Sequence, residues 1–287
     1  MDEDEVLAEY LRFTRQKQRY AKGSPMLFTI DVGNSHTVTG LFEGDDLIGQ
    51  WRLKSDRERT DDELAIRYHA LFSMAGIDKT KISGIILASV VPTLEAAWIS
   101  CCEKYFSKNL EKPLFVVSSE TISHIISIGI DYPEEIGADR LVNAVAAWEQ
   151  YKQNLIIIDF GTAITFDCVS AKCEYLGGTI LPGIAISLDA LSTRAAKLPR
   201  IDVSTPPDGI IGRNTTQAMK SGILYGYGAL VDGLSEKIRG ELCPQGEPLR
   251  VLATGGMAHL IAPYAKVIDE VNPMLTLIGL HLLYHKN

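Results

Sequence analysis

The chain has 287 residues, a net charge of −8 and a pI near 5.3, and 46% of its residues are hydrophobic. This length suggests about two domains, and the apolar fraction is enough for well-packed cores. The acidic balance argues against an extensive nucleic-acid interface, and no apolar run approaches the roughly 18 residues of a membrane span. We therefore expect a protein that binds neither nucleic acid nor membrane.

The first 25 residues form a charged segment that differs from the rest of the chain. It is acidic at its start and basic later, and it ends at Gly23-Ser24-Pro25. Because it lacks a basic start followed by an apolar stretch, it is not a secretory signal. We interpret it as a short helix, a disordered arm or the product of an upstream start codon. The five cysteines show no paired metal-ligand spacing, which favours free thiols in a reducing compartment and a cytoplasmic protein.

The first half predicts three antiparallel strands followed by alternating helices and strands. An apolar run from Met26 to Ile30 predicts a buried strand that ends in a tight turn, and a second β-rich strand follows the turn. Thr60 to Glu63 is a capping box with an acidic first turn, and Gly76 ends the helix that it opens. The remaining predicted elements are a strand at 47–53, a strand at 82–91, a helix at 93–106 and a strand at 114–117. This order is the ribonuclease-H-like pattern.

The second half repeats this order after a linking helix at about 138–151. The predicted elements are strands at 155–160, 164–169 and about 175–181, helices at about 184–196 and 214–240, a strand at 249–253 and a terminal helix at about 274–284. The sequence thus predicts an α/β fold of two ribonuclease-H-like domains with a cleft between them, as in the actin-like ATPase superfamily. We place an N-terminal extension at 1–25, the first domain at 26–137 and the second at 138–287.

One motif occurs twice, once at the start of each predicted domain. A shift of 128 positions superposes Asp31-Val32-Gly33 on Asp159-Phe160-Gly161, and Thr37 on Thr165. Each copy is a buried strand, an Asp-x-Gly turn and a second strand. Glycine lets the backbone approach a ligand closely, and neighbouring hydroxyl or amide groups can donate to phosphate oxygens. Either copy alone is typical of an ordinary hairpin turn, but the pair favours two hairpins that grip one polyphosphate.

A third candidate site opens the linking helix at Gly137-Ala138-Asp139-Arg140. Asp139 lies near the helix N-terminus, where the helix dipole favours a carboxylate, so capping alone is one explanation for it. The other is catalytic, because an aspartate between two phosphate hairpins can accept a proton from a substrate hydroxyl.

These stretches, in this order, resemble the type III pantothenate kinase family of the acetate and sugar kinase, chaperone ATPase and actin superfamily. The resemblance covers about residues 26–287. The matching stretches are Asp31 to Ser35, Ser89 to Pro92, Gly137 to Arg140, Asp159 to Ala163, Gly177 to Gly183, Gly212 to Thr215 and Ala253 to Gly256.

The resemblance implies transfer of the ATP γ-phosphate to pantothenate, giving 4′-phosphopantothenate in the first step of coenzyme A synthesis. It implies that Asp139 accepts the proton, that Thr162 contacts ATP, and that Asp159 ligates potassium or ammonium. The residues implied to bind the ATP phosphates are Asp31, Val32, Gly33, Asn34, Ser35, His36, Thr37 and Val38. Those implied to bind pantothenate are Gly137, Ala138, Asp139, Arg140 and Thr215. Mg²⁺ is required with ATP, and family members are homodimers whose active site is completed at the subunit interface.

The sequence departs from the family pattern at two positions. The family commonly has a tyrosine seven residues before the glycine of Gly-Ala-Asp-Arg, where this chain has Ile130, and His36 replaces a common asparagine.

Two other functions remain as alternatives to pantothenate phosphorylation. One is an ATP-binding regulator of the same fold without pantothenate turnover, and the other is a nucleotide switch that acts through a partner. Several glycines lie within one predicted helix and favour close packing of that helix against a second copy in a dimer. They are Gly222, Gly226, Gly228 and Gly233.

Overall fold

The computed structural model describes residues 25–287, so all but the last residue of the predicted N-terminal extension lies outside the described residues. The described chain forms two compact units. The first comprises the chain up to Ile122 together with Glu134–Val142 and Thr276–Asn287, and the second comprises Ser123–Pro133 and Asn143–Leu275.

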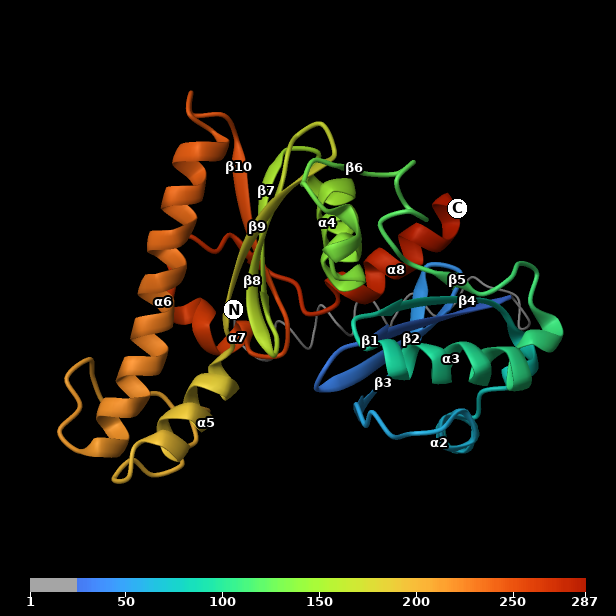
Figure 1. The fold of residues 1–287 in the computed structure, drawn as a ribbon, viewed down its shortest axis with the longest axis horizontal. Coiled ribbons are helices and arrows are strands. Elements are labelled where there is room, and N and C mark those ends of the chain that lie inside the picture. The colour runs from blue at the N-terminus through green and yellow to red at the C-terminus, as the bar shows by residue number, and fades with distance from the viewer. Residues whose placement is uncertain (1–24) are drawn as a thin grey trace. The chain divides into compact units, whose positions relative to one another are not determined.

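The first unit is built on a five-stranded mixed sheet (Figure 1). Its strands are β1 (Met26–Val32), β2 (His36–Glu43), β3 (Asp46–Lys54), β4 (Ile82–Ser89) and β5 (Phe115–Val116), in the order β3-β2-β1-β4-β5. β1 to β3 run antiparallel, and β4 and β5 continue the sheet parallel to β1. Six of the seven residues of β1 are buried, because this strand lies in the middle of the sheet and is covered on both faces.

Two helices, α2 (Asp61–Met74) and α3 (Pro92–Tyr105), cover one face of this sheet (Figure 1). The predicted capping box is confirmed, since Glu63 N–H donates to the Thr60 hydroxyl and the Glu63 carboxylate accepts from Thr60 N–H. An aromatic cluster of Phe28, Tyr68 and Trp98 fills the space between sheet and helices, with Tyr68 and Trp98 ring centroids 4.9 Å apart. Short 3₁₀ turns lie at η1 (Lys79–Lys81), η2 (Ser107–Asn109) and η3 (Pro133–Glu135).

The other face of the sheet holds the C-terminal helix α8 (Leu275–Lys286), which from Thr276 onward belongs to the first unit. A side chain at Gly84 in β4 would overlap the Tyr284 ring, so the absence of a side chain there lets α8 pack closely. His281 is buried, donates from Nε2 to the Gly44 carbonyl (2.8 Å) and packs on Phe42 with 4.5 Å between ring centroids. The end of the chain is thereby tied to the turn between β2 and β3.

The second unit repeats the sheet pattern of the first. Its strands are β6 (Ser127–Ile128), β7 (Asn154–Phe160), β8 (Ala163–Val169), β9 (Glu174–Pro182), β10 (Leu249–Thr254) and β11 (Glu270–Val271). The order is β11-β10-β7-β8-β9-β6, so β9-β8-β7-β10-β11 corresponds to β3-β2-β1-β4-β5. The pairing also corresponds, with an antiparallel meander over β7 to β9 and parallel strands at β10 and β11.

Helices cover both faces of the second sheet (Figure 1). α5 (Ile184–Arg194), α6 (Thr215–Leu242), α7 (Ala258–Ile261) and the turn η4 (Ala262–Tyr264) lie on one face, and α4 (Ala138–Tyr151) lies on the other from Asn143 onward. The predicted fold class, two ribonuclease-H-like units, is confirmed. Across residues 25–287, no helix combines the length and the apolarity that a bilayer crossing requires.

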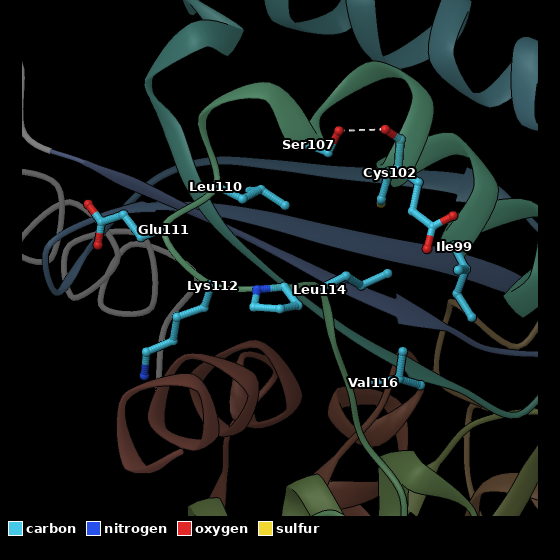
Figure 2. Close-up of a pocket in the computed structure, with 10 residues that line it drawn as sticks. Ile99, Cys102, Ser107, Leu110, Glu111, Lys112, Leu114 and Val116 are labelled. Atoms are coloured by element: carbon cyan, nitrogen blue, oxygen red, sulfur yellow. Dashed lines mark hydrogen bonds between the residues drawn. The ribbon is translucent and has the colours of Figure 1, made fainter.

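The first unit has a hollow of about 570 Å³ between the end of α3 and the segment that leads into β5 (Figure 2). Ile99 and Cys102 of α3 face Leu110, Leu114 and Val116 across it. None of the residues predicted to bind ATP or pantothenate lines this hollow, so it is not the predicted substrate-binding site.

Candidate active site

The first phosphate hairpin is the turn between β1 and β2. Gly33 N–H donates to the His36 carbonyl (3.0 Å), which closes the turn. Asn34, Ser35 and His36 are exposed, and Asp31 is half-buried opposite Val38. The hairpin therefore presents a row of polar side chains to solvent at the end of a rigid, buried strand.

Ser55, just after β3, fixes this hairpin from one side. Its N–H donates to the Ser35 carbonyl (3.0 Å), and its hydroxyl donates to the Gly33 carbonyl (2.6 Å) and lies 3.1 Å from the Thr37 hydroxyl. Three hydrogen bonds from one residue limit the motion of the turn. The sequence reasoning missed Ser55, whose only signal is a serine that follows the third predicted strand.

Two arginines from the same segment also reach the hairpin. Arg57 Nη2 donates to Asn34 Oδ1 (3.1 Å), and Arg52 Nη2 donates to His36 Nδ1 (3.1 Å). Burial of the ring, and the nearby charges of Arg52 and Lys54, lower the pKa of His36 below its usual value. The rim of the hairpin is therefore positively charged and His36 is neutral near pH 7.

Asp139 lies in the first turn of α4, where its Oδ1 accepts from Arg140 N–H (2.8 Å). A Cβ at Gly137 would lie 2.6 Å from that oxygen and 3.1 Å from Val90 Cγ1. Val90 N–H in turn donates to the carbonyl of Val32, the residue before Gly33 (3.0 Å). The Gly137 turn and the first hairpin thus lie at the same edge of the sheet in the first unit.

The second hairpin joins β7 and β8 in the second unit. Gly161 N–H donates to the Ala163 carbonyl (3.1 Å), and the Thr162 carbonyl accepts from Gly183 N–H (3.2 Å). Asp159 Oδ2 accepts from Asn143 Nδ2 (3.4 Å). Gly255 follows β10 with φ +89°, and a Cβ there would overlap Asp159 Oδ1, so a bare backbone lies against this carboxylate.

The two hairpins differ in register by one residue. Asp31 pairs with Val38, but Asp159 pairs with Thr165, although the sequence shift aligns Thr165 with Thr37. The two threonines that the sequence shift aligns therefore occupy different positions in the pairing of their strands. The first turn holds one residue more, and this gives it a longer exposed tip.

The remaining predicted residues lie on the second unit. Thr215 is exposed at the first position of α6, whose cap is Asn214, which accepts from Gln217 N–H (2.9 Å). Ile130, at the position where the family commonly has tyrosine, lies against Gly177 of β9. The structure thus sorts the predicted residues into two groups, with the first hairpin and Asp139 on one unit and Asp159, Thr162 and Thr215 on the other.

A buried carboxylate that sequence reasoning missed lies on β8. Asp167 is fully buried, and its two oxygens accept from the Tyr175 hydroxyl (2.6 Å) and the Thr165 hydroxyl (3.0 Å). Hydrogen bonds to both oxygens offset the cost of burying the group. A single acidic residue in an otherwise uncharged strand was the available signal. No three His, Cys, Asp or Glu side chains gather as a metal site within residues 25–287.

Comparisons with known proteins identify the family of this chain. A family model described as type III pantothenate kinase matches residues 27–237. The type III pantothenate kinase of Desulfotalea psychrophila is 57% identical over 260 residues, which are 91% of this chain and 98% of that protein. The type III pantothenate kinase of Geotalea daltonii is 47% identical over 262 residues, which are 91% of this chain and 99% of that protein.

Solved structures agree on the fold. Component A of the (R)-2-hydroxyglutaryl-CoA dehydratase of Acidaminococcus fermentans matches with a TM-score of 0.54 at 14% identity, over 92% of this chain and 98% of that chain. At this identity the likeness shows the fold alone. The sequence relatives and the family model decide the family: this chain belongs to the type III pantothenate kinases.

Proposed function

We propose that the first hairpin, Asp139 and the second hairpin of this chain carry out the reaction of its family in distinct roles. As a member of that family the chain is a kinase that uses ATP to phosphorylate pantothenate in coenzyme A synthesis. The observation that supports the roles is that the Asp31–Val38 hairpin, whose tip is exposed, and Asp139 lie at one edge of one sheet.

The first hairpin fits a polyphosphate. Backbone N–H groups and short polar side chains at a glycine turn bind phosphate oxygens without bulky side chains in the way. Asn34, Ser35 and His36 are exposed at the tip of the turn. Mg²⁺ binds mainly to phosphates and water in such sites, so it needs few protein ligands. Thr162, exposed at the tip of the second hairpin, is the proposed ATP contact on the other unit.

Asp139 is the proposed proton acceptor. The primary hydroxyl of pantothenate is a weak nucleophile, and a carboxylate within hydrogen-bond reach takes its proton as the new bond to phosphorus forms. The half-buried position in the first turn of α4 holds the carboxylate still while leaving it accessible. Gly137, Ala138, Arg140 and Thr215 are the proposed pantothenate contacts.

Asp159 is the proposed ligand of a monovalent cation, potassium or ammonium. Its carboxylate is half-buried, accepts from Asn143 Nδ2 and lies beside Gly255, which has no side chain of its own to displace it. A cation there offsets repulsion between the carboxylate and ATP phosphates.

A homodimer through α6, in the cytoplasm, completes the proposal. Gly222, Gly226, Gly233 and Gly240 share one face of this helix, and a Cβ at any of them would meet no described atom within 4 Å. Gly228 faces the other way and packs on Tyr264. The four open glycines form a strip on which a second copy of the helix can pack closely.

A coupled assay tests the proposal. Purified protein with Mg-ATP and potassium should form ADP and 4′-phosphopantothenate only when pantothenate is added. ATP binding without pantothenate-dependent turnover would instead support the regulatory alternative.

A further inference from the structure

Arg52 and Arg57 determine which atoms of the phosphate hairpin remain free to donate. A guanidinium group has donors and no acceptor. Because Arg57 contacts the Asn34 side chain at 3.1 Å, the atom that faces it must be the amide oxygen. The Asn34 NH₂ group, on the other branch of the amide, then points away from Arg57 with its donors available.

The same argument fixes the tautomer of His36. Arg52 lies 3.1 Å from His36 Nδ1, which must accept and therefore carries no proton. The ring proton of neutral His36 is then on Nε2, the nitrogen on the far side of the ring. Arg52 and Lys54 are the charged groups that face this ring, and with burial they lower its pKa, which keeps it in this neutral form.

The charges of Arg52 and Arg57 are also uncompensated in the described part of the chain. Each makes its one hydrogen bond to the hairpin, and neither pairs with a carboxylate there. Arg59, two residues further on, differs: it pairs with Asp56 (3.5 Å) and donates to the Lys54 carbonyl (3.2 Å). Two free positive charges at one turn, in a protein of net charge −8, favour an anionic ligand at that turn.

We propose that Arg52 and Arg57 are positioning residues for the polyphosphate of ATP. They orient His36 and Asn34 so that Nε2–H and the NH₂ group donate to phosphate oxygens, and their charges attract the polyphosphate. This inference rests on the proposed function, since it takes the first hairpin as the ATP site. The opposing explanation is that both arginines only fasten the end of β3 to the hairpin.

Four variants separate these explanations: Arg52→Met, Arg57→Met, Arg57→Lys and the control Arg59→Met. Binding of a non-hydrolysable ATP analogue with Mg²⁺ is measured by calorimetry without pantothenate, alongside the KM values of both substrates and the melting temperature. Loss of one charged hydrogen bond should weaken analogue binding and raise the KM for ATP about tenfold in Arg52→Met and Arg57→Met. The KM for pantothenate should change less than about twofold, since these residues contact only the ATP hairpin. Arg57→Lys should recover part of the loss, and Arg59→Met should bind the analogue as the unaltered protein does.

Asn34→Asp gives the sharpest test. It keeps an oxygen toward Arg57 and strengthens that contact, but it removes the NH₂ donor and adds a negative charge. If the NH₂ group donates to phosphate as the positioning role requires, analogue binding weakens while the melting temperature stays unchanged or rises; normal analogue binding by Asn34→Asp would contradict that role.

Three outcomes would overturn the inference: unchanged analogue affinity in both arginine-to-methionine variants, an equal loss in Arg59→Met, or no analogue binding by the unaltered protein. If the analogue binds as expected but pantothenate is not phosphorylated, the catalytic proposal fails while this one stands.

Discussion

Glycines stand beside both aspartates to which we assign chemistry. Gly137 lies where a Cβ would be 2.6 Å from the Asp139 carboxylate, and Gly255 lies where a Cβ would overlap that of Asp159. Gly255 also has φ +89°, a conformation that disfavours side chains. At both positions the lack of a side chain sets where a carboxylate can lie.

Replacing Gly255 should therefore impair the cation site. In Gly255→Ala the methyl group displaces the Asp159 carboxylate, and we expect the potassium concentration for half-maximal activity to rise about tenfold or more. Gly246→Ala is the matched control, because Gly246 also has positive φ (+80°) but open space around it. Both variants should lose some thermal stability, and equal potassium titration curves for the two would contradict the role of Asp159.

Asp139→Asn tests the proton acceptor. The amide keeps the size and hydrogen-bonding oxygen of the side chain but is not basic, so kcat should fall at least about 100-fold. Binding of the ATP analogue should persist. Asp62→Asn, which alters another first-turn carboxylate on α2, is the control and should leave kcat nearly unchanged. If Asp139 only caps the helix, its variant will instead turn over normally and melt at a lower temperature.

Local sequence patterns predicted part of this site. The other residues of the site come from contacts between positions that are far apart in the sequence, which these patterns do not reveal. The Asp-x-Gly turns and the Asp139 turn are visible in sequence, because glycine and strand patterns act over a few residues. Arg52, Ser55 and Arg57 reach the hairpin across 16, 22 and 23 residues of chain, through the register of β2 against β3. That register includes an irregularity between Leu41 and Phe42, which no periodic pattern foretells.

Among the secondary-structure elements, the long ones were predicted well, and of the short ones β5 was predicted but β6, β11 and α7 were missed. The meanders, the parallel strands β4 and β10, and helices α2 to α6 follow apolar periodicity and caps. β6 and β11 have two residues each, and α7 has four, which is too short for any period to show. Such short elements form because a longer neighbouring strand or helix supplies the backbone and side chains with which they pair and pack.

The glycine strip of α6 leads to a prediction about assembly. In Gly226→Leu a bulky side chain projects from the face on which we propose that a second copy packs, so the dimer should dissociate in light scattering. Leucine favours helix more than glycine does, so the altered subunit should not unfold for local reasons. Gly209→Leu, at an open glycine in the loop before α6, should remain dimeric. An unchanged dimer in Gly226→Leu would place the interface elsewhere.

At the scale of the whole molecule, the buried His281 makes stability depend on pH. Burial, chiefly, lowers its pKa below the usual 6.5; His285 acts in the same direction, while the Gly44 carbonyl and Asp45 act against it. As pH falls through about 6.5, the unfolded chain takes up the proton more readily than the folded protein does, so folded stability declines. Well above that pH His281 is neutral in both the folded and the unfolded state, so it no longer makes stability depend on pH.

We therefore expect the melting temperature to drop between about pH 7.5 and pH 5.5, and His281→Gln to reduce this drop. Glutamine can still donate to the Gly44 carbonyl but does not titrate. His285→Gln, at an exposed position on the same helix, is the control and should retain most of the pH dependence. Identical pH profiles for His281→Gln and the unaltered protein would exclude His281 as the source.

The return of α8 to the first unit bears on how the protein is made. The sheet that carries the phosphate hairpin is complete in the nascent chain once β5 has emerged, yet one face of it waits for Leu277, His281 and Tyr284. These residues are synthesised after every strand and helix of the second unit. The sheet of β1 to β5 is therefore synthesised first, but one of its faces is among the last surfaces of the protein to be covered. A chain cut before Leu277 would therefore leave that face of the first sheet uncovered, although the sheet itself lies more than 150 residues earlier in the sequence.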